Sequence, residues 1–172
     1  SSRNAFRTAS QACRHRKKKP VPGEPADHAL GRSRGGWGTK VHLVCDRPGN
    51  PLGFVLTGGQ EQEVMHLDAV LAAVPAGLGP PKALAADKGY SANRVRAKLA
   101  AGGVEDVVAR RKDELARLAD PPAFDKAKYR GRNVIERLNG WLKERRRLAT
   151  RYEKLAVNFA AMLRIACILW YL

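Results

Sequence analysis

The sequence has few cysteines, and they form no pattern that builds a covalent or metal-bound framework. Its 172 residues contain Cys13, Cys45 and Cys167, an odd count without a CxxC pair. The four histidines also lack the short spacing of a metal-binding motif. These features exclude a disulfide scaffold and a CxxC zinc site as organising elements. The basic N-terminus is not followed by the apolar run of a secretory signal, so we expect a reducing, cytoplasmic compartment.

A long apolar run without polar interruption is absent as well. The segment LAVNFAAMLRIACILWYL, residues 155–172, is apolar over 18 residues but contains Asn158 and Arg164. Polar and charged side chains are costly inside a bilayer. We therefore expect a helix that closes a protein core, and no membrane partner.

Acidic residues are scarce relative to basic ones. The chain has 32 Lys and Arg against 16 Asp and Glu, a formal net charge of +16. Residues 1–19 hold seven basic residues and no acid, and residues 130–154 hold nine against three acids. A polyanionic partner, most simply nucleic acid, explains such clusters best. A merely basic soluble protein, or one associated with ribosomes, is the alternative.

Local patterns predict an α/β fold that starts after residue 36, and the hydrophobic fraction of 44% is typical of a folded chain. Residues 1–36 contain RHRKKKPVPGEP and GRSRGG, which indicate a basic, Pro/Gly-rich irregular segment. TKVHLVCD and PLGFVLTGG, joined by RPGN, predict a β-hairpin. Further segments follow in the order helix 64–74, strand 82–87, helix 91–103 with Ser91 available as N-cap, strand 104–110, helix 129–143 and helix 155–172. Residues 37–172 are thus expected to form a mixed sheet covered by helices.

The stretch YRGRNVIERLNGWLK, residues 129–143, has two opposite faces if it is helical. Tyr129, Arg132, Glu136 and Lys143 fall within roughly 60° of arc. An apolar stripe lies on the other side, formed by Val134, Ile135, Leu138, Trp141 and Leu142. Taken alone, the polar face could be an ordinary solvated surface with an Arg–Glu pair at i,i+4.

A second carboxylate makes the polar face more informative. KALAADKGY places Asp87 at the end of an apolar strand, where functional side chains of open α/β sheets are found. Asp before Lys-Gly is also a common turn, so Asp87 alone is a weak signal. Two acids from distant parts of a basic chain, Asp87 and Glu136, are suited to binding Mg²⁺ during phosphoryl transfer.

The spacing of Tyr129, Arg132, Glu136 and Lys143 resembles the signature of bacterial insertion-sequence transposases with a DDE catalytic triad. The likeness extends to HALGRSRGGWGTKVHLV, TGGQ, ADKGY and RNVIERLNGWLKERRRLATRYEKLAVNF, and so covers residues 28–172. It implies a ribonuclease H-like fold, Mg²⁺ (or Mn²⁺) dependence, and DNA cleavage and strand transfer at transposon ends.

Positions matching the family motif receive roles from this resemblance. Asp87 resembles the second acid of the triad and Glu136 the third, and both are expected to bind metal. Tyr129, Arg132 and Lys143 are expected to complete the catalytic group. The expected contacts to double-stranded DNA are listed together: Arg132, Lys143, Arg145, Arg146, Arg147 and Arg151. For Arg145, Arg146 and Arg147, a solvated helix end is the alternative.

The first acid of the triad has no convincing counterpart. It should end a strand before GRSRGG, but Asp27 lies in the Pro-rich stretch and Asp46 lies in the hairpin. Residues 1–19 do not have the pattern of a strand. We therefore expect an incomplete ribonuclease H-like fold with an uncovered sheet edge or face. The chain would be a truncated or frameshifted remnant, its first residues out of the ancestral frame, with impaired catalysis.

Three functional readings stay open at this stage. The first is a transposase. The second is a non-catalytic DNA-binding module, or an inhibitor of an intact transposase, acting as a homo-oligomer or in association with an intact copy. The third is an ordinary basic protein whose acids are solvated.

Overall fold

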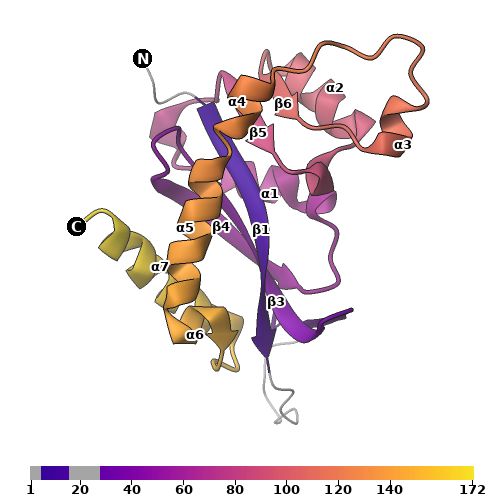
Figure 1. Ribbon diagram of the computed structural model, residues 1–172. Coiled ribbons are helices and arrows are strands. Elements are labelled where there is room, and N and C mark those ends of the chain that lie inside the picture. The colour runs from indigo at the N-terminus through magenta and orange to yellow at the C-terminus, as the bar shows by residue number, and fades with distance from the viewer. Residues whose placement is uncertain (1–4, 16–27) are drawn as a thin grey trace.

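A mixed sheet forms the centre of the computed structural model, which describes residues 5–15 and 28–172 (Figure 1). Its central strands run in the order β2-β3-β1-β5-β6, with β4 paired to β3 and β7 paired to β1. The strands are β1 (Ala5–His15), β2 (Gly31–Ser33), β3 (Gly36–Cys45), β4 (Pro51–Gly58), β5 (Ala83–Ala86), β6 (Glu105–Val108) and β7 (Thr150–Arg151). β3 and β4 are antiparallel, whereas β1, β5 and β6 run parallel. The predicted α/β class and mixed sheet are confirmed.

The β3–β4 hairpin is confirmed, and its turn is held by an aspartate. The Asp46 carboxylate accepts hydrogen bonds from the backbone N–H groups of Gly49 at 3.0 Å and Asn50 at 2.8 Å. Gly49 has φ of +106°, a conformation that glycine adopts without strain. Asp46 therefore stabilises a turn, in agreement with its rejection as the missing first acid.

The prediction that residues 1–36 are irregular is wrong for two segments, β1 and β2. β1 lies at the centre of the sheet, antiparallel to β3 over Arg7–Arg14 and parallel to β5 over Ala5–Thr8. Its Phe6 and Ala9 are buried in two different core clusters. The small and basic side chains of β1 favour a strand only weakly by themselves. Hydrogen bonding to β3 on one edge and to β5 on the other stabilises the extended conformation. The expectation of an uncovered sheet through loss of this strand is therefore wrong, and residues 1–4 and 16–27 lie outside the described residues.

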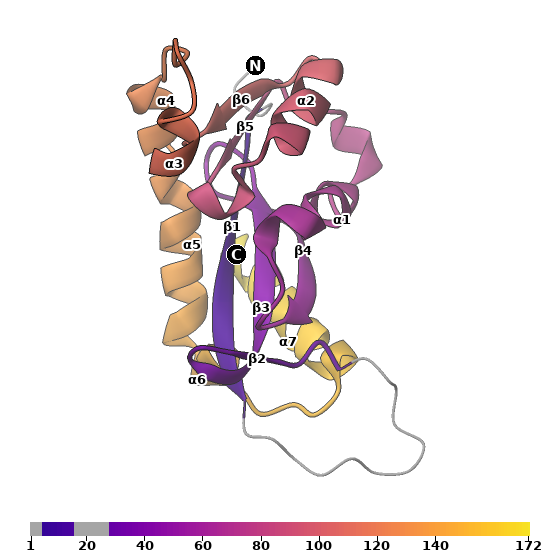
Figure 2. The ribbon, with the colours of Figure 1, turned by 90° about the vertical axis from the view of Figure 1, so that its right-hand side faces the viewer.

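Helices cover both faces of the sheet (Figure 2). One face carries α1 (Leu67–Ala72) and α2 (Asn93–Ala101), and the other carries α5 (Asn133–Glu144) and α7 (Ala156–Trp170). The shorter helices are η1 (Glu63–His66), η2 (Ala76–Leu78), η3 (Lys88–Tyr90), α3 (Lys112–Leu115), α4 (Lys126–Arg130) and α6 (Arg146–Ala149). The helix expected over 129–143 is divided, because α4 ends at Arg130 and α5 begins at Asn133. Ser91 does not cap α2, since its hydroxyl bonds the Glu114 carboxylate at 2.6 Å.

The apolar stripe of α5 lies against the sheet as predicted. Ile135, Leu138 and Leu142 are fully buried and pack in one cluster with Phe159 and Leu163 of α7. Burying each such side chain contributes about 1.5–3 kcal/mol, so this stripe fixes the orientation of α5. The opposite, polar side of α5 consequently faces away from the core. Within the described residues, every helix is too short or too polar to cross a bilayer.

Candidate functional site

Asp87 directly follows β5 and closes the turn that begins η3. Its Oδ1 accepts a hydrogen bond from the Gly89 N–H at 2.8 Å, and its carbonyl accepts one from Tyr90 N–H at 3.1 Å. Burial raises the pKa of the Asp87 carboxyl, and the Glu63 carboxylate raises it further, while the Gly89 hydrogen bond and Arg132 oppose this. Asp87 thus has the structural role of a turn residue and also lies in a shared electrostatic environment with Arg132.

Arg132 links the motif residues across the break between α4 and α5. Its Nη2 lies 2.5 Å from Glu136 Oε1, and its guanidinium lies 5.3 Å from the centre of the Tyr129 ring. Half of the Glu136 side chain is exposed (51%), against 18% for Arg132. The fold therefore brings Tyr129 and Glu136 to the Arg132 guanidinium, whose charge also lowers the pKa of Asp87. The i,i+4 pair expected of a solvated helix is present, and its arginine also interacts electrostatically with a half-buried acid from another element.

Lys143 is exposed on the same side of α5 but lies apart from this group. Seven residues of helix separate it from Glu136, which corresponds to about 10 Å along the axis. A ligand that touches both must be extended, as a nucleic acid backbone is.

Sequence reasoning missed Glu63, a third carboxylate near Asp87. A Cβ built on Gly89 would lie 2.9 Å from Asp87 Oδ1 and 3.2 Å from the Glu63 carboxyl carbon, so both acids border the same glycine. Lys40 Nζ lies 2.8 Å from Glu63 Oε1 and offsets its charge. In the sequence, TGGQEQE places acids shortly after a strand end, which is a position where functional carboxylates are found. The sequence does not distinguish Glu63 from its neighbour Glu61, whereas the proximity of Glu63 to Gly89 in the structure does.

The strand expected to carry the first acid is present, and it contains no acid. The parallel register pairs Thr8 with Ala86, which places Ala9 level with Asp87. Residues 5–15 read AFRTASQACRH, without Asp or Glu. Of the neighbours of Asp87 on β1, Thr8 bonds the Tyr90 hydroxyl at 3.4 Å and Ala9 packs in the core. Asp27 lies outside the described residues.

The donor set around Asp87 does not fit a two-metal centre. Among the described residues, no three or more His, Cys, Asp or Glu side chains are grouped so that they could hold a metal ion. The nearest cation to Glu136 is the paired Arg132 guanidinium, which a metal ion would have to displace or tolerate. The described side chains around Asp87 therefore lack the set of acidic ligands that a two-metal centre requires.

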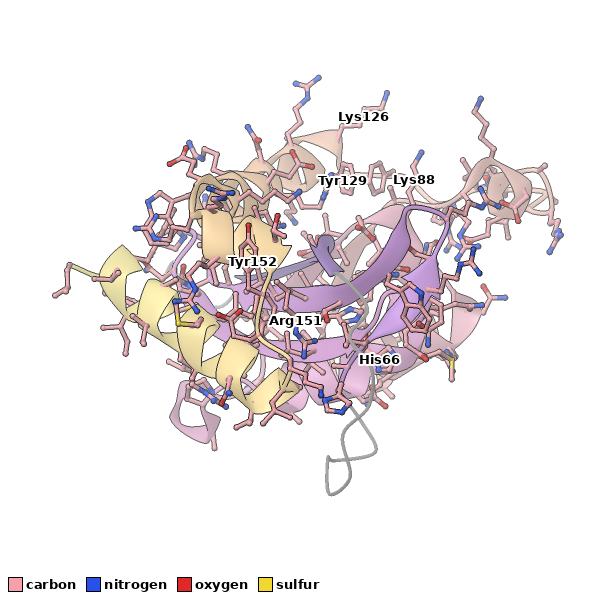
Figure 3. The ribbon with its side chains drawn as sticks, turned by 90° about the horizontal axis from the view of Figure 1, so that it is seen from below. His66, Lys88, Lys126, Tyr129, Arg151 and Tyr152 are labelled. Atoms are coloured by element: carbon pink, nitrogen blue, oxygen red, sulfur yellow. The ribbon has the colours of Figure 1, made fainter. Side chains whose placement is uncertain are left out.

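A cleft of about 630 Å³ is lined by Lys88, the residue after Asp87, and combines cations with aromatic rings. Lys88, Lys126 and Arg110 line it together with Tyr129 and Phe124, whose ring centres are 5.2 Å apart. Lys88, Lys126 and Tyr129 lie at the same edge of the molecule (Figure 3). Aromatic faces beside basic side chains are suited to single nucleotides and backbone phosphates.

The three predicted DNA-contacting arginines at α6 differ in exposure and in their partners. Arg146 is exposed, and Arg147 is 63% exposed but pairs with Glu153 at 2.7 Å. Arg145 is half-buried, and its guanidinium stacks 3.5 Å from the Trp141 ring centre. Three adjacent cations at α6 are thus held in different ways, and Arg146 is the most available to a partner.

The interpretation of Arg151 as a DNA contact is wrong in this structure. Arg151 is only 1% exposed and lies within the molecule beside the sheet (Figure 3). Its guanidinium donates to the carbonyls of His28 at 2.7 Å and Lys154 at 2.9 Å, and also to the Thr39 hydroxyl. A basic run in the sequence does not distinguish a solvated arginine from one that satisfies buried carbonyls. Arg151 ties β7 to β3 and to the segment before β2.

Comparison with known proteins agrees with the motif. A family model described as a transposase DDE domain matches residues 7–171. The chain belongs to the transposase DDE domain family. A protein of Burkholderia cepacia assigned as a transposase for insertion sequence element IS402 is 34% identical over 139 residues. That alignment covers 77% of this chain and 62% of the relative, so the chain spans less than two thirds of the relative's length.

Solved transposase structures are more distantly similar to this DDE domain. A piggyBac transposase synaptic complex with hairpin DNA has 13% identity and a TM-score of 0.44, covering 73% of this chain and 29% of the other. The Mos1 strand transfer complex has 14% identity and a TM-score of 0.41, covering 88% and 56%.

The family match also bears on the N-terminal boundary of the DDE domain. The match begins at residue 7, inside β1, and so includes residues 7–36.

Proposed function

We propose that this transposase DDE domain binds double-stranded DNA through the polar side of α4–α6 and neither cleaves nor joins it. One observation carries the proposal: β1 runs beside the strand that leads to Asp87 but contains no carboxylate, while the cationic side is retained. The strand order and the flanking helices support a ribonuclease H-like fold for this domain. Under this proposal the whole activity of the family, strand cleavage and transfer at transposon ends, is not performed by this chain.

The proposed DNA contacts follow from exposure and position. Arg146 and Lys143 are exposed, and Arg145 lies between them in the chain. Arg132 and Tyr129 would orient the backbone at the entrance of the cleft beside Asp87. Each phosphate that such cations neutralise releases counterions, so affinity should fall steeply with salt. Asp87 and Glu136 retain the family positions and would hold at most one Mg²⁺ or Mn²⁺ ion.

A second candidate function rests on the same observation. A DNA-binding face beside an acid-poor β1 would let the chain occupy transposon ends without producing cleaved DNA. It would then inhibit an intact transposase by competition for those ends, with or without association between the two proteins.

DNA binding is tested by fluorescence anisotropy with a duplex, measured as a function of salt. Lys143→Gln and Arg146→Gln should each reduce the slope of log affinity against log salt by about one. Lys98→Gln serves as the matched control, because Lys98 is 51% exposed on α2, on the other face of the sheet. Equal slopes for all three variants and the parent would refute the proposed interface.

Loss of catalysis is tested separately by nicking and strand-transfer assays with Mg²⁺ or Mn²⁺. The expected result is no product with the purified chain. Metal-dependent product that disappears in Asp87→Ala would overturn the non-catalytic part of the proposal. Inhibition is checked by adding the chain to an active transposase of the same element: product should fall as DNA ends become occupied, and less so with Arg146→Gln.

A further inference from the structure

A hollow of about 470 Å³ lies on the α4 side of the sheet, where β1, β5 and β6 begin. Figure 1 shows α4 in front of this edge of the sheet. Small side chains leave the space open: Ala5, Ala83 and Ala85 on the strands, and Ala127 and Gly131 on the helical side. The Asp87 carboxylate follows the opposite end of β5, and neither Asp87 nor Arg132 lines the hollow.

The charges that line the hollow are mainly positive. Arg7 of β1, Arg47 of the hairpin turn and Lys128 of α4 contribute cations, and Glu105 is the single acid among the described lining residues. Glu105 already pairs with Lys128, with Nζ and Oε1 2.6 Å apart. The two guanidinium groups are therefore not neutralised by a lining acid.

Arg7 is the unusual member of this set, because a buried cation normally has partners for its donors. It is 7% exposed, yet its one hydrogen bond among the described residues is a long contact of 3.5 Å from Nη1 to the Asp46 carbonyl. Its buried Nε has no hydrogen-bond partner. Burial lowers the pKa of the Arg7 guanidinium and the neighbouring Arg47 lowers it further, but a guanidinium stays protonated at neutral pH. The Arg7 guanidinium thus lines the cationic hollow, and one 3.5 Å contact from Nη1 is its only hydrogen bond among the described residues.

We propose that this hollow is a binding pocket for a phosphate monoester, with Arg7 as its buried anchor and Arg47 as its outer cation. A guanidinium matches two phosphate oxygens with two parallel N–H···O bonds, and Lys128 adds a point charge at the helix. The alanine walls suit a compact organic group attached to the phosphate, such as a nucleoside. The 5′-phosphate of a DNA end and a free nucleotide share this chemistry. Because binding is predicted without any duplex, the inference stands independently of the proposed DNA interface.

The first experiment measures the melting temperature of the full chain with dAMP and with deoxyadenosine at equal ionic strength. A ligand that binds only the folded chain raises its melting temperature. We expect dAMP to stabilise the chain and deoxyadenosine to leave it unchanged. Absence of a dAMP-specific increase would overturn the proposal.

Variants identify the pocket. Arg47→Gln removes an exposed cation of the rim and should weaken dAMP binding about tenfold or more, the usual effect of losing a charge-assisted hydrogen bond. Arg117→Gln, an exposed arginine outside the pocket, is the control and should keep full affinity. Arg7→Met should abolish the effect, and if that variant fails to fold, Arg47→Gln decides the outcome. Unchanged dAMP affinity in Arg47→Gln would overturn the assignment.

Gly131→Ala tests the geometry without removing charge. Gly131 has helical angles of φ −58° and ψ −14°, so alanine is permitted by the backbone. Its Cβ would lie 2.9 Å from Arg7 Nη2 and so displace the anchoring guanidinium. dAMP binding should weaken in this variant, and unaltered binding would count against Arg7 as anchor.

The source of the phosphate is resolved with duplexes that carry either a 5′-phosphate or a 5′-hydroxyl end. Tighter binding of the phosphorylated duplex, lost in Arg47→Gln, supports a DNA end as occupant. Equal binding of both duplexes, together with stabilisation by dAMP, supports a soluble phosphate monoester.

Discussion

Replacing Arg151 with methionine provides the most direct test of how this DDE domain divides its basic residues. The sequence placed Arg151 among the DNA contacts, whereas the structure buries it and surrounds it with acceptors. Its Nη1, Nη2 and Nε donate respectively to carbonyls of His28 at 2.7 Å, Lys154 at 2.9 Å and Glu153 at 2.9 Å. Methionine replaces the aliphatic stem of the side chain but removes the guanidinium group and every donor.

The expected loss of stability follows from those unpaired acceptors. Each buried carbonyl left without a donor costs about 1–3 kcal/mol, although not all will be sealed from water after the change. These carbonyl partners of Arg151 are neutral, so its removal leaves no unpaired charge among them, and the loss is the sum of these penalties over three carbonyls. We therefore expect Arg151→Met to lower the free energy of unfolding by about 4 kcal/mol.

Urea denaturation followed by circular dichroism measures this change. With a slope of about 2 kcal/mol per molar urea, the midpoint should fall by about 2 M. Arg146→Met is the matched control, because Arg146 is exposed and its replacement should change stability by less than about 0.5 kcal/mol. Arg146→Met should weaken DNA binding, whereas Arg151→Met should retain it at temperatures where the variant is folded. A midpoint near that of the parent, with weakened DNA binding, would refute the structural role of Arg151.

Other predictions concern single sites in the same domain. Burial, assisted by nearby positive charges, lowers the pKa of His42 from 6.5 to about 4, so the unfolded chain binds this proton at a higher pH than the folded chain. As the pH falls from 6.5 to 4, the free energy of unfolding of the parent should therefore decrease by about 3 kcal/mol more than that of His42→Gln. Equal decreases in the two proteins would contradict this. Gly53→Ala should destabilise the folded chain by about 1–3 kcal/mol in the same assay, because the new Cβ would lie 2.5 Å from the Ala73 carbonyl oxygen. Gly77→Ala is the control, since a Cβ at Gly77 meets no atom within 4 Å and should be tolerated. Burial raises the pKa of Asp87, so the ionised carboxylate destabilises the folded chain at neutral pH, and Asp87→Asn should raise the melting temperature there. This increase should become smaller as the pH falls through the pKa of Asp87 in the folded chain. An increase that does not depend on pH would exclude ionisation as its cause.

The central position of β1 changes the explanation for the absent first acid. The strand that should carry it is paired on both edges, so its backbone position in the sheet is intact. Arg7 and Ala9 point toward the face covered by α5, where one lines the cationic hollow and the other packs in the core. The difference from the family motif thus lies in side-chain chemistry and not in the loss of a structural element.

The sequence pattern by itself was sufficient to predict those helices and strands that are stabilised by contacts between residues close in the chain. Alternation and a turn predicted the β3–β4 hairpin, and a 3.6-residue repeat predicted the buried stripe of Ile135, Leu138 and Leu142. The position of Asp87 at a strand end followed from a short apolar run before a Lys-Gly turn. The spacing of the motif on α4 and α5 was sufficient to indicate the family.

Only the tertiary structure decided features that depend on partners distant in the chain. β1 is a strand because β3 and β5 pair with it, and its own residues carry little strand signal. Arg151 and Arg7 are both basic residues near basic clusters, yet folding surrounds Arg151 with carbonyls and leaves the buried Nε of Arg7 without a partner among the described residues. Sequence records the charge of a side chain, whereas its solvation and hydrogen-bond partners are set when remote segments pack together.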